Sequence, residues 1–162
     1  MTMTIVKVGI ADMKVASKES IIRTSGLGSC VGITLYDGSL KIGGMVHIML
    51  PESPTNKSQF KRTKYADTGI VDLLTEMENM GCKRRNLVSK MAGGAHMFKF
   101  SGGSELLKIG ERNAKAVEEV LTDLKVKILA KDVGGDYGRT IDLFCETGKL
   151  QIKTINRGVK EV

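Results

Sequence analysis

Apolar and polar positions alternate most clearly in two neighbouring runs, residues 30–37 and 40–50. Between them lies Gly38-Ser39, a pair suited to the positive φ of a tight turn. The pattern predicts a β-hairpin. One face of this hairpin is apolar, and the opposite face is less hydrophobic and carries Cys30 and His47.

Two later stretches have the apolar spacing of helices with one buried face. The first stripe comprises Ile70, Leu73, Leu74, Met77 and Met80. Gly81 follows it, where a left-handed cap would end the helix. The second helix is expected to start near Gly110, and its stripe comprises Ala116, Val117, Val120, Leu121 and Leu124.

Further strands are predicted at residues 3–11, 87–92 and 126–133, and a final hairpin pairs 140–146 with 150–155 about Thr147-Gly148. Strands outnumber helices, and most connections are hairpins. A chain of 162 residues with 41% apolar residues can bury one continuous core. We therefore predict a single α/β domain over residues 1–162: an α/β/α-type sandwich with a mixed, largely antiparallel sheet and two main helices.

The net charge of +7 gathers at residues 61–64, at 83–85 and along the tail from 149 to 160. Such clusters attract anionic surfaces. The simpler explanation is a solvated basic face, and the functional interpretation that we favour is an acidic protein partner. Nucleic acid is not expected, because the chain has only seven Phe and Tyr residues and lacks a zinc knuckle.

The chain contains neither a run of about 18 apolar residues nor the charged-then-apolar start of a signal peptide. Its three cysteines form an odd, widely spaced set, which suits neither a disulfide framework nor a structural zinc site. We therefore expect a cytoplasmic protein without direct membrane insertion.

The predicted hairpin brings a thiol close to an imidazole. If Gly38-Ser39 is a two-residue turn, opposed residue numbers sum to 77 and Cys30 faces His47, with Cβ atoms about 4.5 to 5.5 Å apart. If the turn is Asp37-Gly38, the sum is 75 and the two are diagonal neighbours on one face. A three-residue loop or a bulge would break this parity. The pattern thus predicts Cys30 as nucleophile and His47 as its base, a pairing that should lower the pKa of the thiol.

The segment before the cysteine, residues 25–29, contains two glycines that let the chain turn and expose backbone N–H groups. The amides of Gly28 and Ser29 are the candidates for stabilising an oxyanion, and Thr24 is placed to orient the imidazole. A lone cysteine is more often a small buried hydrophobe. Coincidence is harder to accept when the paired placement, the glycine-rich approach and the less hydrophobic face occur together.

The remaining candidates favour structural roles. Cys82 and Cys145 have no histidine nearby in sequence. His96 follows a glycine-rich bend, where it either lines the site or faces solvent, and we favour solvent. The glycines from Gly26 to Gly32 miss the dinucleotide-binding spacing by one residue and precede a strand, which excludes that interpretation.

Six short motifs carry a family resemblance. They are IRTSGLGSCVG at residues 22–32, VHIMLP at 46–51, KYAD at 64–67, AGGA at 92–95, IGERN at 109–113, and GG at 134–135 with GRT at 138–140. With these motifs the chain resembles, over nearly its whole length, the CheD family of bacterial chemoreceptor glutamine deamidases.

The resemblance implies a catalytic cysteine at Cys30, a histidine base at His47 and an orienting threonine at Thr24, which the hairpin argument reached independently. It implies no cofactor and no metal. Where this chain has His96, the family more often has glutamine.

The resemblance also implies the substrate, a glutamine side chain on the cytoplasmic domain of a methyl-accepting chemotaxis receptor, which becomes glutamate. A CheC-type response-regulator phosphatase is the implied second partner, and some members are reported as methylesterases. The alternative is a regulatory binding module for receptors and the phosphatase, with weak or secondary catalysis.

Overall fold

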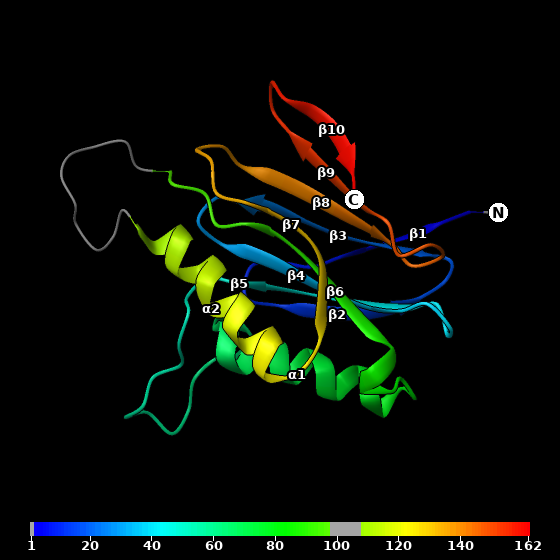
Figure 1. The fold of residues 1–162 in the computed structure, drawn as a ribbon, viewed down its shortest axis with the longest axis horizontal. Coiled ribbons are helices and arrows are strands. Elements are labelled where there is room, and N and C mark those ends of the chain that lie inside the picture. The colour runs from blue at the N-terminus through cyan, green and yellow to red at the C-terminus, as the bar shows by residue number, and fades with distance from the viewer. Residues whose placement is uncertain (1, 98–107) are drawn as a thin grey trace.

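The computed structural model describes residues 2–97 and 108–162, which form two five-stranded sheets and two helices (Figure 1). The outer sheet has the order β1 (Thr4–Lys7), β3 (Ser20–Leu27), β8 (Arg139–Phe144), β9 (Leu150–Thr154) and β10 (Gly158–Glu161). The central sheet has the order β2 (Met13–Ser17), β5 (Ile42–Ile48), β4 (Val31–Asp37), β6 (Leu87–Gly93) and β7 (Lys127–Val133). The helices are α1 (Ala66–Asn79) and α2 (Ile109–Asp123), with 3-10 turns at Arg62–Lys64 and Arg84–Asn86.

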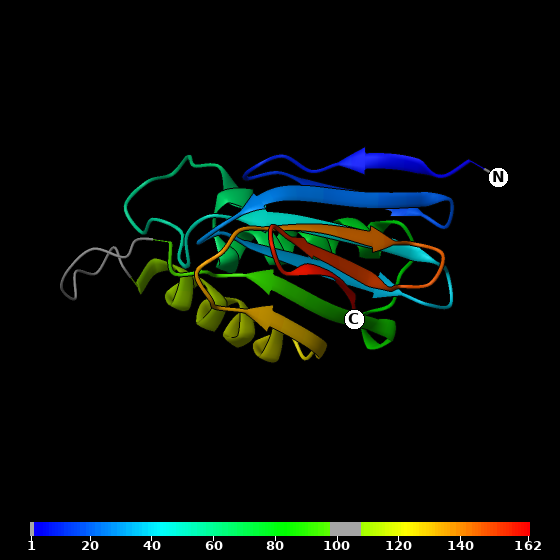
Figure 2. The same cartoon turned by 90° about the horizontal axis from the view of Figure 1, so that it is seen from above.

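The predicted α/β class, with two helices and mixed, largely antiparallel strands, is confirmed. The layer order differs from the expected α/β/α arrangement. Both helices cover one face of the central sheet, and the outer sheet covers its other face (Figures 1 and 2). One core cluster therefore lies between helices and central sheet, and a second lies between the two sheets.

Glycines explain why the less hydrophobic hairpin face is buried. A Cβ atom on Gly32 would come within 2.8 Å of the Ile141 side chain, and one on Gly43 within 2.8 Å of Leu143. The missing side chains make room for apolar residues of β8, which fill the space from the opposite sheet. In the sequence this face is the less hydrophobic one because its glycines contribute no apolar side chain of their own.

Most elements lie where the apolar pattern predicts them. The two stripes form α1 and α2, the predicted strands at 87–92 and 126–133 are β6 and β7, and the last predicted hairpin is β8 with β9. Gly81 has the expected positive φ, 102°. Met80 is 45% exposed rather than buried, because α1 ends at Asn79 and Met80 is its cap.

Three strands were not predicted, namely β2, β3 and β10, and the predicted strand at residues 3–11 is only the four-residue β1. β1 and β10 are edge strands that are almost wholly exposed, so they have little apolar alternation. β3 is joined to β1 in parallel and to β8, which is more than a hundred residues away. Such long-range pairing leaves no local signal.

The β4–β5 connection is longer than predicted. Asp37 pairs with Ile42, so opposed residue numbers sum to 79 instead of 77 or 75. Within the loop, Asp37 Oδ1 accepts hydrogen bonds from the Ser39 amide and hydroxyl and from the Leu40 amide. Lys41 has the positive φ, 54°. A four-residue loop adds two positions to the predicted turn, so the parity of the two strands is unchanged.

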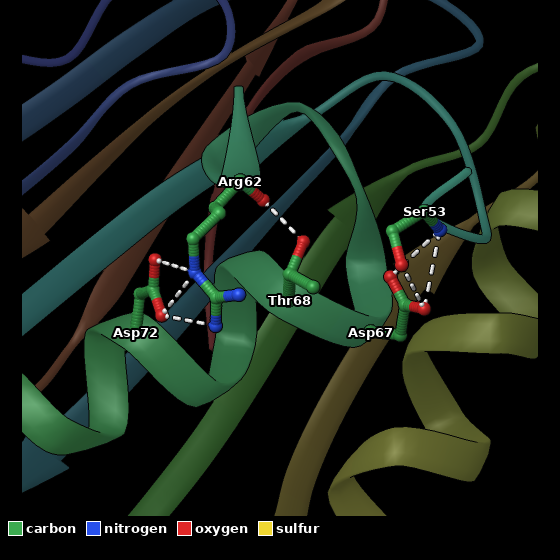
Figure 3. Close-up of polar contacts among 5 residues, drawn as sticks. All are labelled: Ser53, Arg62, Asp67, Thr68 and Asp72. Atoms are coloured by element: carbon green, nitrogen blue, oxygen red, sulfur yellow. Dashed lines mark hydrogen bonds and ion pairs between the residues drawn. The ribbon is translucent and has the colours of Figure 1, made fainter. Parts of the chain in front are cut away.

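The excursion after β5, residues 51–61, is fastened at its base (Figure 3). Asp67 accepts hydrogen bonds from the Ser53 amide and hydroxyl. Arg62 donates to both oxygens of Asp72, and the Thr68 hydroxyl donates to the Arg62 carbonyl at 2.6 Å. These bonds tie both ends of the excursion to the first turns of α1.

Candidate active site

The predicted catalytic residues come from three elements at one end of the two sheets. Cys30 directly precedes β4, His47 lies in β5 and Thr24 lies in β3 of the outer sheet. Gly32 is the residue opposite His47, so Cys30 and His47 are diagonal neighbours. This is the relation predicted for the alternative turn, and the direct opposition predicted for the first turn is wrong. Cys30 and His47 nevertheless share a face, and Cys30 packs against the core between the sheets.

The hydrogen bonds of Thr24 determine which ring nitrogen of His47 carries the proton. The Thr24 hydroxyl donates to the Val8 carbonyl at 2.8 Å, and its oxygen lies 2.7 Å from His47 Nδ1. A hydroxyl has one proton, so with that proton on the Val8 carbonyl the oxygen accepts from Nδ1–H. His47 Nε2 then holds the lone pair, which makes it the basic nitrogen.

This basic nitrogen is buried. His47 has no exposed surface, and Nε2 has no hydrogen-bond partner among the described residues. Desolvation by burial lowers the pKa of His47 to about 4. The imidazole is therefore neutral at physiological pH and able to accept a proton.

Cys30 is partly buried, and burial raises the pKa of its thiol above the usual value, while its own backbone amide acts in the opposite direction. The predicted lowering by His47 is wrong, because a neutral imidazole offers no positive charge to stabilise a thiolate. The resting pair is a thiol beside an imidazole, and a proton must leave Sγ as the nucleophile attacks.

The segment before Cys30 lies against the end of β6. The carbonyls of Gly28 and Cys30 accept hydrogen bonds from the amides of Ala95 and Gly94, at 2.8 and 2.9 Å. A Cβ atom on Gly93 would lie 2.2 Å from the Cys30 carbonyl oxygen, so this approach requires glycine.

Amide N–H groups are available beside the thiol. Of the two predicted oxyanion donors, Gly28 already donates to the Gly26 carbonyl at 3.0 Å. Among the described residues, no backbone carbonyl accepts a hydrogen bond from the amide of Ser29 or Cys30. These two N–H groups, one predicted and one not, are the better-placed donors for an oxyanion.

The other candidates lie apart from this arrangement. His96 is exposed and lines a pocket of about 380 Å³ between α2 and the end of β7, so the predicted solvent position is confirmed. Cys82 and Cys145 are buried, and burial raises the pKa of each thiol to about 11. Within residues 2–97 and 108–162, no three His, Cys, Asp or Glu side chains gather as metal ligands, and neither helix is long and apolar enough to span a membrane.

Sequence reasoning missed one buried polar residue at the site. Asn113 of α2 has no exposed surface, and its Nδ2 donates to the carbonyls of Ser29 and Met49. The motif at residues 109–113 was noticed only as part of the resemblance. Asn113 precedes Val117 by four residues and so falls on the apolar stripe of this helix, and a polar residue in that stripe was the signal that could have identified it.

The raised pKa of Cys30 predicts how fast this thiol is alkylated. Because iodoacetamide reacts with the thiolate, we expect the Cys30 rate to rise about tenfold per pH unit from pH 7 to 9, without a plateau. Mass spectrometry of the Cys30 peptide measures this rate, and the buried Cys82 and Cys145 serve as slow internal references. A plateau below pH 8 would show a stabilised thiolate and contradict the neutral pair.

Comparison with known proteins identifies the family of this chain. The family model described as CheD chemotactic sensory transduction matches residues 49–154. A protein of Halalkalibacterium halodurans named chemoreceptor glutamine deamidase CheD is 51% identical over 159 residues, 98% of each chain. Proteins named probable chemoreceptor glutamine deamidase CheD are 50% identical in Syntrophomonas wolfei, over 95% of this chain and 96% of that one, and 49% identical in Caldanaerobacter subterraneus, over 98% of each. The chain belongs to the CheD family.

Proposed function

We propose that this protein deamidates glutamine side chains of methyl-accepting chemotaxis receptors, with Cys30 as nucleophile, His47 as base and Thr24 as the residue that orients the base. The observation that carries the proposal is the unpartnered, buried Nε2 of His47 on the face that also holds Cys30, with Nδ1 fixed by Thr24. Relatives of nearly equal length are named for this activity.

The mechanism follows from the neutral pair. His47 Nε2 takes the proton of Cys30 Sγ as the sulfur attacks the carboxamide carbon, and the amides of Ser29 and Cys30 hold the oxyanion. The imidazolium gives the proton to the leaving nitrogen, the C–N bond of the tetrahedral intermediate breaks, and ammonia departs to leave a thioester. Nε2 then activates a water molecule that hydrolyses the thioester, which releases glutamate and restores the thiol.

The activity is tested by intact-mass analysis of a purified receptor cytoplasmic fragment after incubation with this protein. Each deamidated glutamine adds about 1 Da, because the amide NH2 group is replaced by OH. Ammonia release should match the mass gain in amount. Demonstrable receptor binding without any mass change would contradict the enzyme and favour the regulatory binding module.

The basic excursion at residues 51–61 supports an acidic receptor surface as the docking partner. It projects from the end of the sheets where β4 begins and β5 ends (Figure 1), and its residues Lys57 and Lys61 are both exposed. The base of the excursion is hydrogen-bonded to α1, and positive charges at this end of the molecule would steer an acidic helix toward the end that carries Cys30.

Reversing the two charges should weaken substrate capture. For Lys57→Glu/Lys61→Glu we expect KM for the receptor fragment to rise roughly five-fold in 50 mM salt and much less in 500 mM salt, with kcat unchanged. Steady-state kinetics at both salt concentrations measure this effect. Lys83→Glu/Arg85→Glu, which reverses two exposed charges beyond the far end of α1, is the matched control. An equal KM change in the control would contradict local docking.

We also propose that the protein acts in the cytoplasm and that a CheC-type phosphatase is its second partner. The family resemblance supports this partner. Isothermal titration with the purified phosphatase, repeated with saturating receptor fragment, tests both the complex and competition at the site. Absence of binding heat at micromolar concentrations would contradict the partnership without affecting deamidation.

A further inference from the structure

We propose that Asn113 is a positioning residue that holds the Cys30 segment and the His47 segment at their working separation. The inference rests on the proposed function for its kinetic consequence. The hydrogen bonds on which the inference is based are present in the fold whether or not the proposed function is correct.

The two strands separate directly before Val31, where Cys30 lies, and directly after Ile48, the residue that follows His47. The β4–β5 ladder ends at the pair Val31 and Ile48. Beyond it, the amide of Met49 donates to the Lys64 carbonyl, and the Cys30 carbonyl accepts from Gly94. Each segment is thus bonded to a different neighbour. The ladder pairs His47 with Gly32 but does not include Cys30, so it fixes only one of the two reacting groups at this end.

Asn113 bridges this opening. Its Nδ2 donates to the Ser29 carbonyl and to the Met49 carbonyl, both at 2.9 Å. Ser29 directly precedes Cys30, and Met49 follows His47 by two residues. Because one planar amide group supplies both donors, the separation of the two carbonyls is fixed by its geometry. The side chain of Asn113 is completely buried, so water does not compete for these bonds.

The helix can deliver this side chain because its start packs unusually close to the loop. A Cβ atom on Gly110 would lie 2.3 Å from the Ala95 carbonyl oxygen, and one on Gly94 would lie 2.8 Å from the Gly110 carbonyl oxygen. Asn113 follows Gly110 by three residues and therefore projects from the same side of α2. The motif at residues 109–113 therefore has two structural roles: Gly110 allows close packing against the loop, and Asn113 bridges the two segments.

Kinetics of Asn113→Leu test the proposal, because leucine has a similar volume and no donor. We expect kcat for the receptor fragment to fall roughly 10- to 100-fold through misplacement of the reacting groups, with KM within about three-fold of the unmodified protein. Leu121→Ala is the matched control, since Leu121 is a fully buried residue of the same helix, away from the site. Its kcat should stay within about three-fold while its thermal stability falls.

The pH dependence of kcat in Asn113→Asp is a second test, because general destabilisation would not produce it. A protonated carboxyl has one O–H to donate to a carbonyl, and a carboxylate has none. The kcat of Asn113→Asp, relative to the unmodified protein, should therefore recover severalfold as pH falls from 8 to 5.5. A ratio independent of pH, or a kcat of Asn113→Leu equal to that of Leu121→Ala, would overturn the proposal.

Amide hydrogen exchange separates failure of this proposal from failure of the proposed function. We expect the amides of Met49 and Gly94 to exchange at least about tenfold faster in Asn113→Leu than in Leu121→Ala, as the opening loses its bridge. If the unmodified protein does not deamidate receptors, the proposed function is wrong. The hydrogen-exchange rates then still test whether Asn113 holds the two segments together. Unchanged exchange at these amides overturns the proposal.

Discussion

Cys30→Ala is expected to lower the rate of receptor deamidation by roughly 10⁴-fold or more, because the variant has no atom that can form the thioester. Cys30 is partly buried and small, so the substitution removes little packing and should leave receptor binding unchanged. Intact-mass analysis over a long incubation measures the residual rate, and isothermal titration measures binding. Together these measurements separate chemistry from docking.

Two other cysteines provide matched controls for this loss. Cys82→Ala and Cys145→Ala each remove a buried thiol whose pKa is raised to about 11. Both variants should keep kcat within about three-fold while losing some stability from the small cavity. Full activity of Cys30→Ala would show that another residue is the nucleophile, and loss of activity in both controls would show that the loss in Cys30→Ala is not specific to the nucleophile.

His47→Gln is expected to lower kcat by about 10³-fold, since proton transfer by a positioned side chain contributes roughly 10² to 10⁴. In the unmodified protein, kcat/KM should rise with pH through an inflection near 4, where the His47 pKa lies. The sign follows from the mechanism, because the neutral imidazole is the base and protonation below that pKa inactivates it. The variant should lack the inflection. An inflection that persists in His47→Gln would assign it to another group.

The same pKa also predicts a pH-dependent stability. The unfolded chain takes up a proton near the ordinary histidine pKa of 6.5, whereas the folded protein does so only near 4. The unfolded state thus binds more protons between these values, so the free energy of unfolding falls as pH drops from 6.5 to 4, by about 3 kcal/mol. Urea unfolding of the unmodified protein and of His47→Gln across this window measures the difference. Equal pH dependence in both would contradict a buried neutral His47.

Thr24 illustrates the limit of local sequence patterns. Its role as the orienting residue was suggested by its place upstream of Cys30, but β3, the strand that carries it, was not predicted. Thr24 reaches His47 across the space between the two sheets, and its proton goes to Val8, on a segment beside β1. Neither partner is marked by local sequence, because both are set by strand pairing over long distances.

The sequence by itself determined that Cys30 and His47 share a face, because side chains alternate with a period of two and any even-numbered loop preserves that parity. It also determined α1 and α2 through their apolar stripes. Tertiary structure alone decided the rest. The outer sheet buries the catalytic face, which leaves His47 neutral and raises the pKa of Cys30 through desolvation. The approach of α2 brings Asn113 to the carbonyls of two separated segments. These outcomes depend on which elements pack together, and burial and long-range pairing are properties of the assembled layers.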